Sequence, residues 1–246
     1  MVLTLVLLAV TGGLMAQQDS IPVKKKTFTR ILFTASAGYS MPLGDYKAVD
    51  WSADGSGYAG SGFIVSAGIN WIGKRGFGIG ASYVFQYNPL QDTAKNVIPD
   101  GHLYTLGTKP WNNHYVLAGP VYQQTFGKVT VEAGILVGAV LAMSSNFYIT
   151  LPAADSTSPP TTSEGAGFGF GYKLMAGVGY QVSGRVSFSA NLSYLGGSPS
   201  RTKDYYYYTY EQDPVLGLVP VYQGAEFTMK KKISSFNPGI GITVKL

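Results

Sequence analysis

Few side chains in this sequence could do acid–base or metal chemistry. There are two histidines, His102 and His114, and no cysteine. A catalytic histidine needs a Ser, Asp or Glu partner, and neither histidine has one at a diagnostic spacing. The sequence also has no metal-ligand cluster, no phosphate-binding loop and no hydrolase elbow. We therefore expect no catalytic residue, no metal and no cofactor, and predict that the protein is not an enzyme.

Two other groups of residues suit binding rather than catalysis. Tyrosine rings offer a large, rigid, amphipathic surface to a glycan or a protein, and one run contains Tyr205, Tyr206, Tyr207, Tyr208 and Tyr210. Clustered cations can pair with phosphate groups, and the same region contains Arg201, Lys203, Lys230, Lys231 and Lys232. Each group also has a plainer interpretation: the tyrosines pack on their own β-ribbon or loop, and the basic residues are only solvated.

The segment from Phe168 to Tyr194 shows which elements must position these residues. Its even-numbered residues are aromatic or aliphatic, its odd-numbered ones are mostly Gly, Ser or amide, and Ser183-Gly184 interrupts the alternation. A period of two with a two-residue turn predicts a β-hairpin. Neither face has the charge of a solvated surface. We infer that bulky side chains face lipid and small polar ones fill a narrow lumen.

The same alternation recurs along the chain. It predicts strands at about 30–40, 63–71, 77–87, 114–126, 129–143, 168–182, 186–194 and 236–246. Because proline cannot donate to a ladder, we expect a bulge or local irregularity at Gly119-Pro120. Long and short connections alternate, and 196–231 is the longest. This pattern predicts an all-β, antiparallel up-and-down transmembrane β-barrel of eight strands, with ten strands as the alternative.

Composition and the N-terminal segment agree with that fold. Charged residues are 13% of the 246 residues, against roughly 25% in soluble domains. Residues 1–16 are apolar and uncharged, which predicts a cleaved signal peptide, with a membrane anchor as the alternative. Residues 17–29 would then form a periplasmic linker and 30–246 the barrel. The expected location is the cell outer membrane.

Charge separates the two ends of the predicted barrel. The end with the short turns and the termini holds nine basic residues and one acidic residue: Lys24, Lys25, Lys26, Arg30, Lys74, Arg75, Lys128, Arg185 and Lys245 against Asp19. A basic ring on this side would meet anionic lipid headgroups. This uneven distribution supports a periplasmic position for the short turns, and despite the net charge of +5 we do not expect nucleic acid as a partner.

The pattern also resembles a known family. The residues that carry the likeness are 33–46 (FTASAGYSMPLGDY), 117–122 (LAGPVY) and the alternating strand that ends at Leu246. They are similar to the small outer-membrane β-barrels of Bacteroidetes, which are related in architecture to the transmembrane domain of the OmpA class. The resemblance implies a fold and a location rather than an activity, and we expect no peptidoglycan-binding domain after the barrel.

The predicted barrel assigns positions to the candidate residues. Lys173, Glu132, Gln86 and Asn191 face the lumen, with Lys173 near mid-membrane and Glu132 nearer the periplasmic end, beside Arg185 or Lys245. The tyrosines and the basic cluster lie on the outer side, within reach of lipopolysaccharide and of a surface glycan or protein. We expect a non-enzymatic structural or surface-interaction role. A narrow porin-like channel for small solutes and an outer-leaflet lipid A-modifying enzyme using His114 remain the alternatives.

Loop length and charge together predict the orientation. A protease added to intact cells should cut within 88–111 or 196–231 and should leave Lys74-Arg75 intact, because the short turns face the periplasm. The fragments are identified by mass spectrometry, with lysed cells as the control in which both sides are accessible. Cleavage at Lys74-Arg75 in intact cells would invert the topology.

Overall fold

The computed structural model describes residues 30–49, 57–91, 96–97, 104–105, 110–143, 166–213 and 217–246. Its strands are β1 (Arg30–Pro42), β2 (Gly62–Ile72), β3 (Phe77–Asn88), β4 (Asn96–Val97), β5 (Tyr104–Thr105), β6 (Trp111–Phe126), β7 (Val129–Met143), β8 (Ala166–Gln181), β9 (Val186–Asp213), β10 (Gly217–Lys230) and β11 (Ile233–Lys245). A short 3-10 turn, η1 (Gly44–Tyr46), follows β1. Within these residues no helix is long and apolar enough to cross a membrane.

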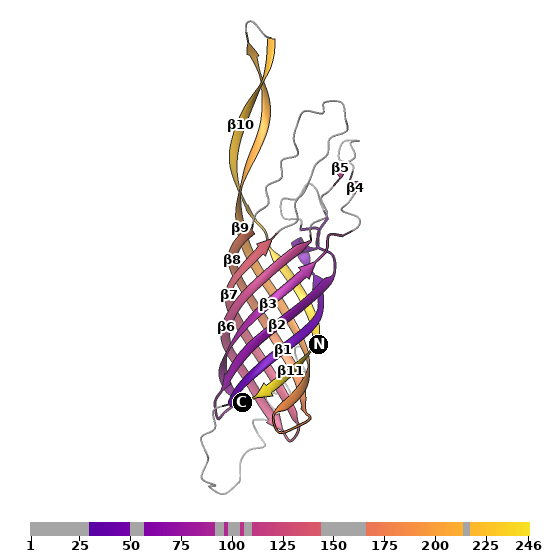
Figure 1. Cartoon of the computed structure of the whole chain (residues 1–246), viewed down its shortest axis with the longest axis vertical. Coiled ribbons are helices and arrows are strands. Elements are labelled where there is room, and N and C mark those ends of the chain that lie inside the picture. Colours follow the sequence, from indigo (N-terminus) through magenta and orange to yellow (C-terminus); the bar gives the residue numbers. More distant parts are fainter. Residues whose placement is uncertain are drawn as a thin grey trace.

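Eight of the strands form a closed antiparallel barrel (Figure 1). The sheet order is β10-β9-β11-β1-β2-β3-β6-β7-β8, and the additional pairing of β9 with β8 closes the ring. β10 pairs with β9 but does not enter the ring, and β4 and β5 form a separate two-stranded sheet. The prediction of eight strands is confirmed. The ten-stranded alternative is wrong because the additional strand lies beyond the barrel.

The longest predicted loop is largely β-structure. β9 has 28 residues and continues past the barrel, where Ser200 to Asp213 pair with Gly217 to Lys230 of β10. The two strands form a twisted ribbon that projects from one end of the barrel (Figure 1). The interpretation of 196–231 as a loop is therefore wrong. Tyr, Thr and Val, which favour strands, are frequent on both sides of the ribbon and let an extended ladder form there.

The turn of the β8–β9 hairpin is wider than predicted. Gln181 pairs with Ser187 and Tyr180 with Phe188, which leaves residues 182–186 between the paired positions. A two-residue turn at Ser183-Gly184 would instead place Tyr180 opposite Ser187. Because side-chain direction alternates along a strand, an odd number of connecting residues is needed to place both aromatic faces on the same side. The two-residue turn was therefore a wrong prediction.

Proline interrupts two ladders without shifting their register. Ala118 pairs with Val137 and Val121 with Gly134, so the register between β6 and β7 is the same on both sides of Gly119-Pro120. The β1–β11 ladder is interrupted in the same way at Pro238. The predicted irregularity at Pro120 is confirmed as a local loss of pairing, but the bulge is not formed.

The outward face of the barrel is apolar at alternate positions on every strand. Side chains such as Phe77, Val116 and Ile240 are among the most exposed in the molecule, at 69%, 66% and 73%. A soluble domain rarely leaves an apolar surface of this extent uncovered. A closed ladder leaves no unpaired edge along the barrel, as a membrane-spanning sheet requires. The barrel is therefore built to face lipid.

The face assignment predicts how a charge acts at neighbouring positions. Ala190→Arg or Val178→Arg, on the lipid-facing side, should lower the free energy of unfolding by about 2–4 kcal/mol. Ser189→Arg, on the lumen side of the same strand, should cost much less because Ser189 lines a water-accessible cavity. Urea titration of the barrel folded in lipid vesicles measures both. Equal effects at 189 and 190 would contradict the assignment.

Candidate functional site

The half of the lumen at the ribbon end is filled with large side chains; with the orientation predicted above, this is the outer half, and the opposite half is the periplasmic one. Inward positions near that end include Val84, Tyr115, Leu117, Leu136, Val140 and Leu195, each at most 2% exposed. The small lumen residues predicted from the sequence therefore describe only part of the interior. Eight strands leave room for side chains but not for an open pore, and here these residues occupy that room.

A hydrogen-bonded network crosses this packed region, and Gln86 is at its centre. The Gln86 amide donates to the hydroxyls of Ser40 (2.8 Å) and Ser235 (2.9 Å) and accepts from Asn113 (3.2 Å) and Tyr115 (3.3 Å). These partners come from β1, β11 and β6, and all are buried. Within the described residues the Asn113 Oδ1 atom has no hydrogen-bond partner, but the four bonds to Gln86 join β3 to β1, β6 and β11. In a low-dielectric interior such bonds fix the positions of the strands that they join.

The connection after β1 caps the outer end of the lumen. Tyr46 of η1 is buried, and its ring meets that of Trp111 edge-on at 5.5 Å. The Tyr46 hydroxyl accepts from Asn113 (2.9 Å) and donates to Asn88 (3.2 Å), and the Trp111 indole donates to the Gly57 carbonyl (2.7 Å). A Cβ at Gly57 would lie within 2.5 Å of the Tyr46 carbonyl oxygen, so only glycine permits this approach.

Burial in the cap also keeps the phenol of Tyr46 protonated. Burial raises the pKa of Tyr46 well above its ordinary value, and the hydrogen bond with Asn113 opposes this only in part. The cap and the Gln86 network were not predicted from the sequence. The available signal was the break in the small-residue pattern at inward positions such as Leu136 and Val140.

The periplasmic half of the lumen is polar and open. A cavity of about 170 Å³ is lined by Glu132 together with three cations at its rim, Arg30, Arg185 and Lys245. Glu132 lies opposite Gly177, whose missing side chain leaves room for the carboxylate: a Cβ there would be 2.8 Å from Glu132 Oε1. This cavity is the water-accessible part of the interior, and it meets the packed region above it.

Lys173 lies between the cavity and the packed outer half. Its side chain is 8% exposed, and its neighbours across the ladders are Leu136 and Leu195. Glu132 is four residues away along the register, so the two charges sit at different depths, as predicted. Arg185 and Lys245 line the same cavity as Glu132. The expected pairing of Glu132 with one of these two cations stays a prediction.

The other two predicted lumen residues also face inward. Gln86 is fully buried in the packed half and is engaged by the network described above. Asn191 lies opposite Gly177, at the level of Glu132, and its Oδ1 would be 3.0 Å from a Cβ placed at Gly239. The lumen residues thus separate into two groups: Gln86 closes the outer end, while Asn191, Glu132 and Lys173 form the polar transition below it.

The outer-rim candidates lie where β9 leaves the barrel and β10 returns to it. Lys230 pairs with Ser200, Lys230 and Lys232 are exposed, and the Lys231 backbone N–H donates to the Pro199 carbonyl (3.0 Å). The ribbon register places Tyr208 opposite Tyr222 and Tyr205 opposite Ala225. The side chains of Arg201, Lys203, Tyr205, Tyr206, Tyr207, Tyr208 and Tyr210 lie outside the described residues, so their roles remain predictions.

His114 is on the outward face of β6. Its Nδ1 is 2.7 Å from the Tyr83 hydroxyl, and its ring is 5.1 Å from that of Phe85. The hydrogen-bond partner is thus a phenol rather than the Ser, Asp or Glu of an acid–base pair. Groups of three or more His, Asp or Glu able to hold a metal are absent from the described residues. His102 lies outside them.

A closed eight-stranded barrel with an apolar exterior, a packed outer lumen and a polar inner cavity belongs to the class of small outer-membrane β-barrels. No protein-family model matches the chain, and no curated protein matches it in sequence. The resemblance to the Bacteroidetes family therefore stays a prediction.

Solved structures resemble the chain in fold alone. Neisserial surface protein A is 12% identical, with a TM-score of 0.43 over 90% of this chain and 100% of that one. Ail, the attachment invasion locus protein of Yersinia pestis, is 12% identical, with a TM-score of 0.39 over 89% of this chain and 100% of its own. The outer membrane protein AlkL is 13% identical, with a TM-score of 0.37 over 94% of this chain and 97% of its own.

Gln86→Leu tests the network. It keeps most of the side-chain volume but leaves buried hydroxyl and amide groups without partners, so the free energy of unfolding should fall by about 2–4 kcal/mol. Gln124→Leu, the same change on the outward face of β6, is the matched control and should cost less than about 0.5 kcal/mol. Urea titration in lipid vesicles measures both. Equal small effects would mean that the network does not hold the strands together.

Proposed function

We propose that the protein is an integral outer-membrane barrel with a non-enzymatic, surface-interaction role carried by its β9–β10 ribbon. The observation that carries the proposal is the contrast between the two ends of the molecule. The lumen is packed and capped at the outer end, and the longest ordered element projects outward from that same end (Figure 1). A barrel of this form suits a rigid membrane anchor for a binding element.

The sequence of the ribbon supports a binding role. Tyrosines occupy consecutive positions of β9 from 205 to 208. A two-stranded ribbon is marginally stable alone in water, and its register places one aromatic pair, Tyr208 and Tyr222, opposite each other. The same rings suit a glycan or protein partner. At its base, Lys230 and Lys232 suit the phosphates of lipopolysaccharide.

The packed lumen argues against the channel alternative. Buried side chains such as Tyr115, Leu136 and Leu195 occupy the outer half, so solutes in the inner cavity have no open route past them. The enzyme alternative lacks a second catalytic group, since the hydrogen-bond partner of His114 is Tyr83. Neither alternative is favoured by a specific contact among the described residues.

The proposal is tested by removing the ribbon alone. Ser200 and Lys230 are register partners, so an Asn-Gly turn can join them in place of residues 201–229. The shortened barrel should fold, with unfolding free energy within about 1 kcal/mol of the full chain. It should lose the partners that the full protein captures when intact cells are treated with an amine-reactive crosslinker.

A second variant keeps the ribbon and replaces Tyr205, Tyr207 and Tyr208 by Thr, a good strand residue; it should also lose capture. Retention of every partner by both variants would contradict the surface role of the ribbon. The full-length protein should show no single-channel conductance in a planar bilayer. A steady conductance would favour the channel alternative instead.

A further inference from the structure

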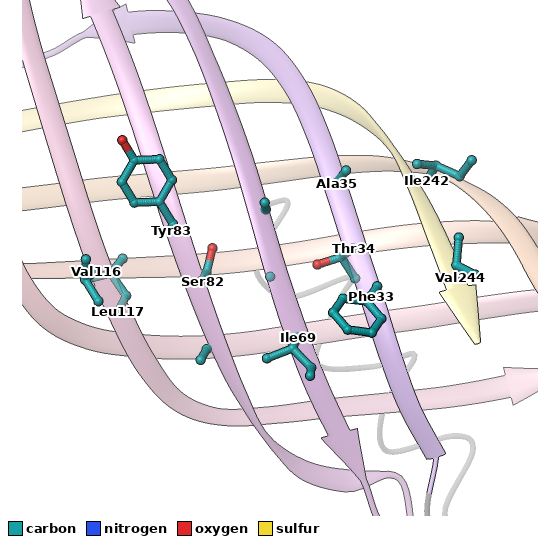
Figure 2. Close-up of a pocket in the computed structure, with 13 residues that line it drawn as sticks. Phe33, Thr34, Ala35, Ile69, Ser82, Tyr83, Val116, Leu117, Ile242 and Val244 are labelled. Atoms are coloured by element: carbon teal, nitrogen blue, oxygen red, sulfur yellow. The ribbon is translucent and has the colours of Figure 1, made fainter. Parts of the chain in front are cut away.

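A groove of about 580 Å³ crosses the outward face of β11, β1, β2, β3 and β6 (Figure 2). Its floor is made of small residues from three adjacent strands, Ala35, Ala67 and Ala81. The register explains why they meet. Ala35 lies opposite Ala67, and Ala81 lies opposite Ile69, one outward-facing position further along β2.

Large apolar side chains form the walls of this groove. Phe33, Ile69 and Val116 rise beside the alanines and are 47%, 42% and 66% exposed. The groove lies on the lipid-facing side of the barrel, so hydrocarbon rather than water is available to fill it. A gap left empty would forfeit the dispersion contacts of its lining. The shape and the lining therefore fit an acyl chain.

A polar pair stands at one margin of the groove. Tyr83 lines the groove, and its hydroxyl lies 2.7 Å from His114 Nδ1. When the phenol donates to Nδ1, the imidazole proton is on Nε2. That N–H is a hydrogen-bond donor on a largely apolar outward face. In a membrane, an unpaired donor costs free energy, so an acceptor from a lipid is expected beside it.

The position of the Tyr83–His114 pair along the barrel indicates which lipid can reach it. His114 is three residues from Trp111, where β6 begins at the outer end of the barrel, and two residues from Val116 in the groove wall. The polar margin therefore faces the outer leaflet. A lipid whose ester carbonyl lies at the level of His114 can extend its acyl chain along the alanine floor.

We propose that this groove and the Tyr83–His114 pair bind the lipid A part of lipopolysaccharide. One acyl chain lies over Ala35, Ala67 and Ala81, and an ester carbonyl of the same lipid accepts a hydrogen bond from His114 Nε2. The inference rests on the outer-membrane location proposed above, but it does not involve the ribbon.

The experiment measures lipid retained by the purified, detergent-solubilised full-length protein in native mass spectrometry after addition of hexa-acylated lipid A. The wild-type barrel should retain one lipid A. Ala67→Phe fills the groove and should abolish retention. His114→Phe removes the donor but keeps the ring, and should weaken retention roughly two- to tenfold. Ala176→Phe, an equal insertion on the outward face of β8, is the matched control and should retain lipid A as the wild type does.

Three outcomes would overturn the proposal. The first is equal retention by the wild type, Ala67→Phe and His114→Phe. The second is equal retention of phosphatidylethanolamine in a parallel titration, which would make the groove a general phospholipid contact. The third is a wild-type dimer that Ala67→Phe converts to a monomer, which would make the face a protein interface. Heat-modifiable electrophoretic mobility verifies that each variant is a folded barrel. If the wild type shows no heat-modifiable mobility, it is not a folded barrel, and the proposed function is contradicted as well.

Discussion

The rest of the structure depends on the requirement that every backbone N–H and C=O group in the membrane has a partner within the protein. The pairing of β9 with β8 and of β11 with β1 meets this requirement by closing the sheet. Closure also explains the odd-length connection between β8 and β9, because only that parity keeps the aromatic side chains of both strands on the lipid side. Pro120 and Pro238 are accommodated because each interrupts one ladder and leaves the register unchanged.

Outside the membrane, water can pair with backbone N–H and C=O groups, so the part of β9 beyond the barrel does not need a neighbouring strand on both sides. The same strand is part of the closed barrel as far as Ser200 and then becomes half of a two-stranded ribbon with open edges. Edges that would be costly in hydrocarbon are solvated by water beyond the rim. One strand thus joins the rigid anchor to the projecting element, so the base of the ribbon is fixed by the two ladders of the barrel.

The lumen is divided by depth. Toward the periplasm, small residues leave a polar cavity that Glu132 lines, and toward the outside, large side chains and the cap formed by Tyr46 and Trp111 fill the lumen. Gln86 links strands that are far apart in the sequence, since its partner Ser235 is 149 residues away. Lys173 is at the boundary between the two parts, with Leu136 and Leu195 as its neighbours across the ladders.

The sequence by itself determined the eight strands of the barrel and their faces, because the alternation of residues such as Val178 and Ala190 with Gly177 and Ser189 is a local property of each strand. It did not predict the ribbon, whose strands do not alternate. It also placed Lys173, Glu132, Gln86 and Asn191 in the lumen. Only the tertiary structure decided which of these residues meet. The Gln86 network and the alanine groove each join residues from three or more strands, and the cap joins η1 to β3 and β6. Those meetings depend on how far each strand is shifted against the next, and a period of two within a strand carries no information about that shift.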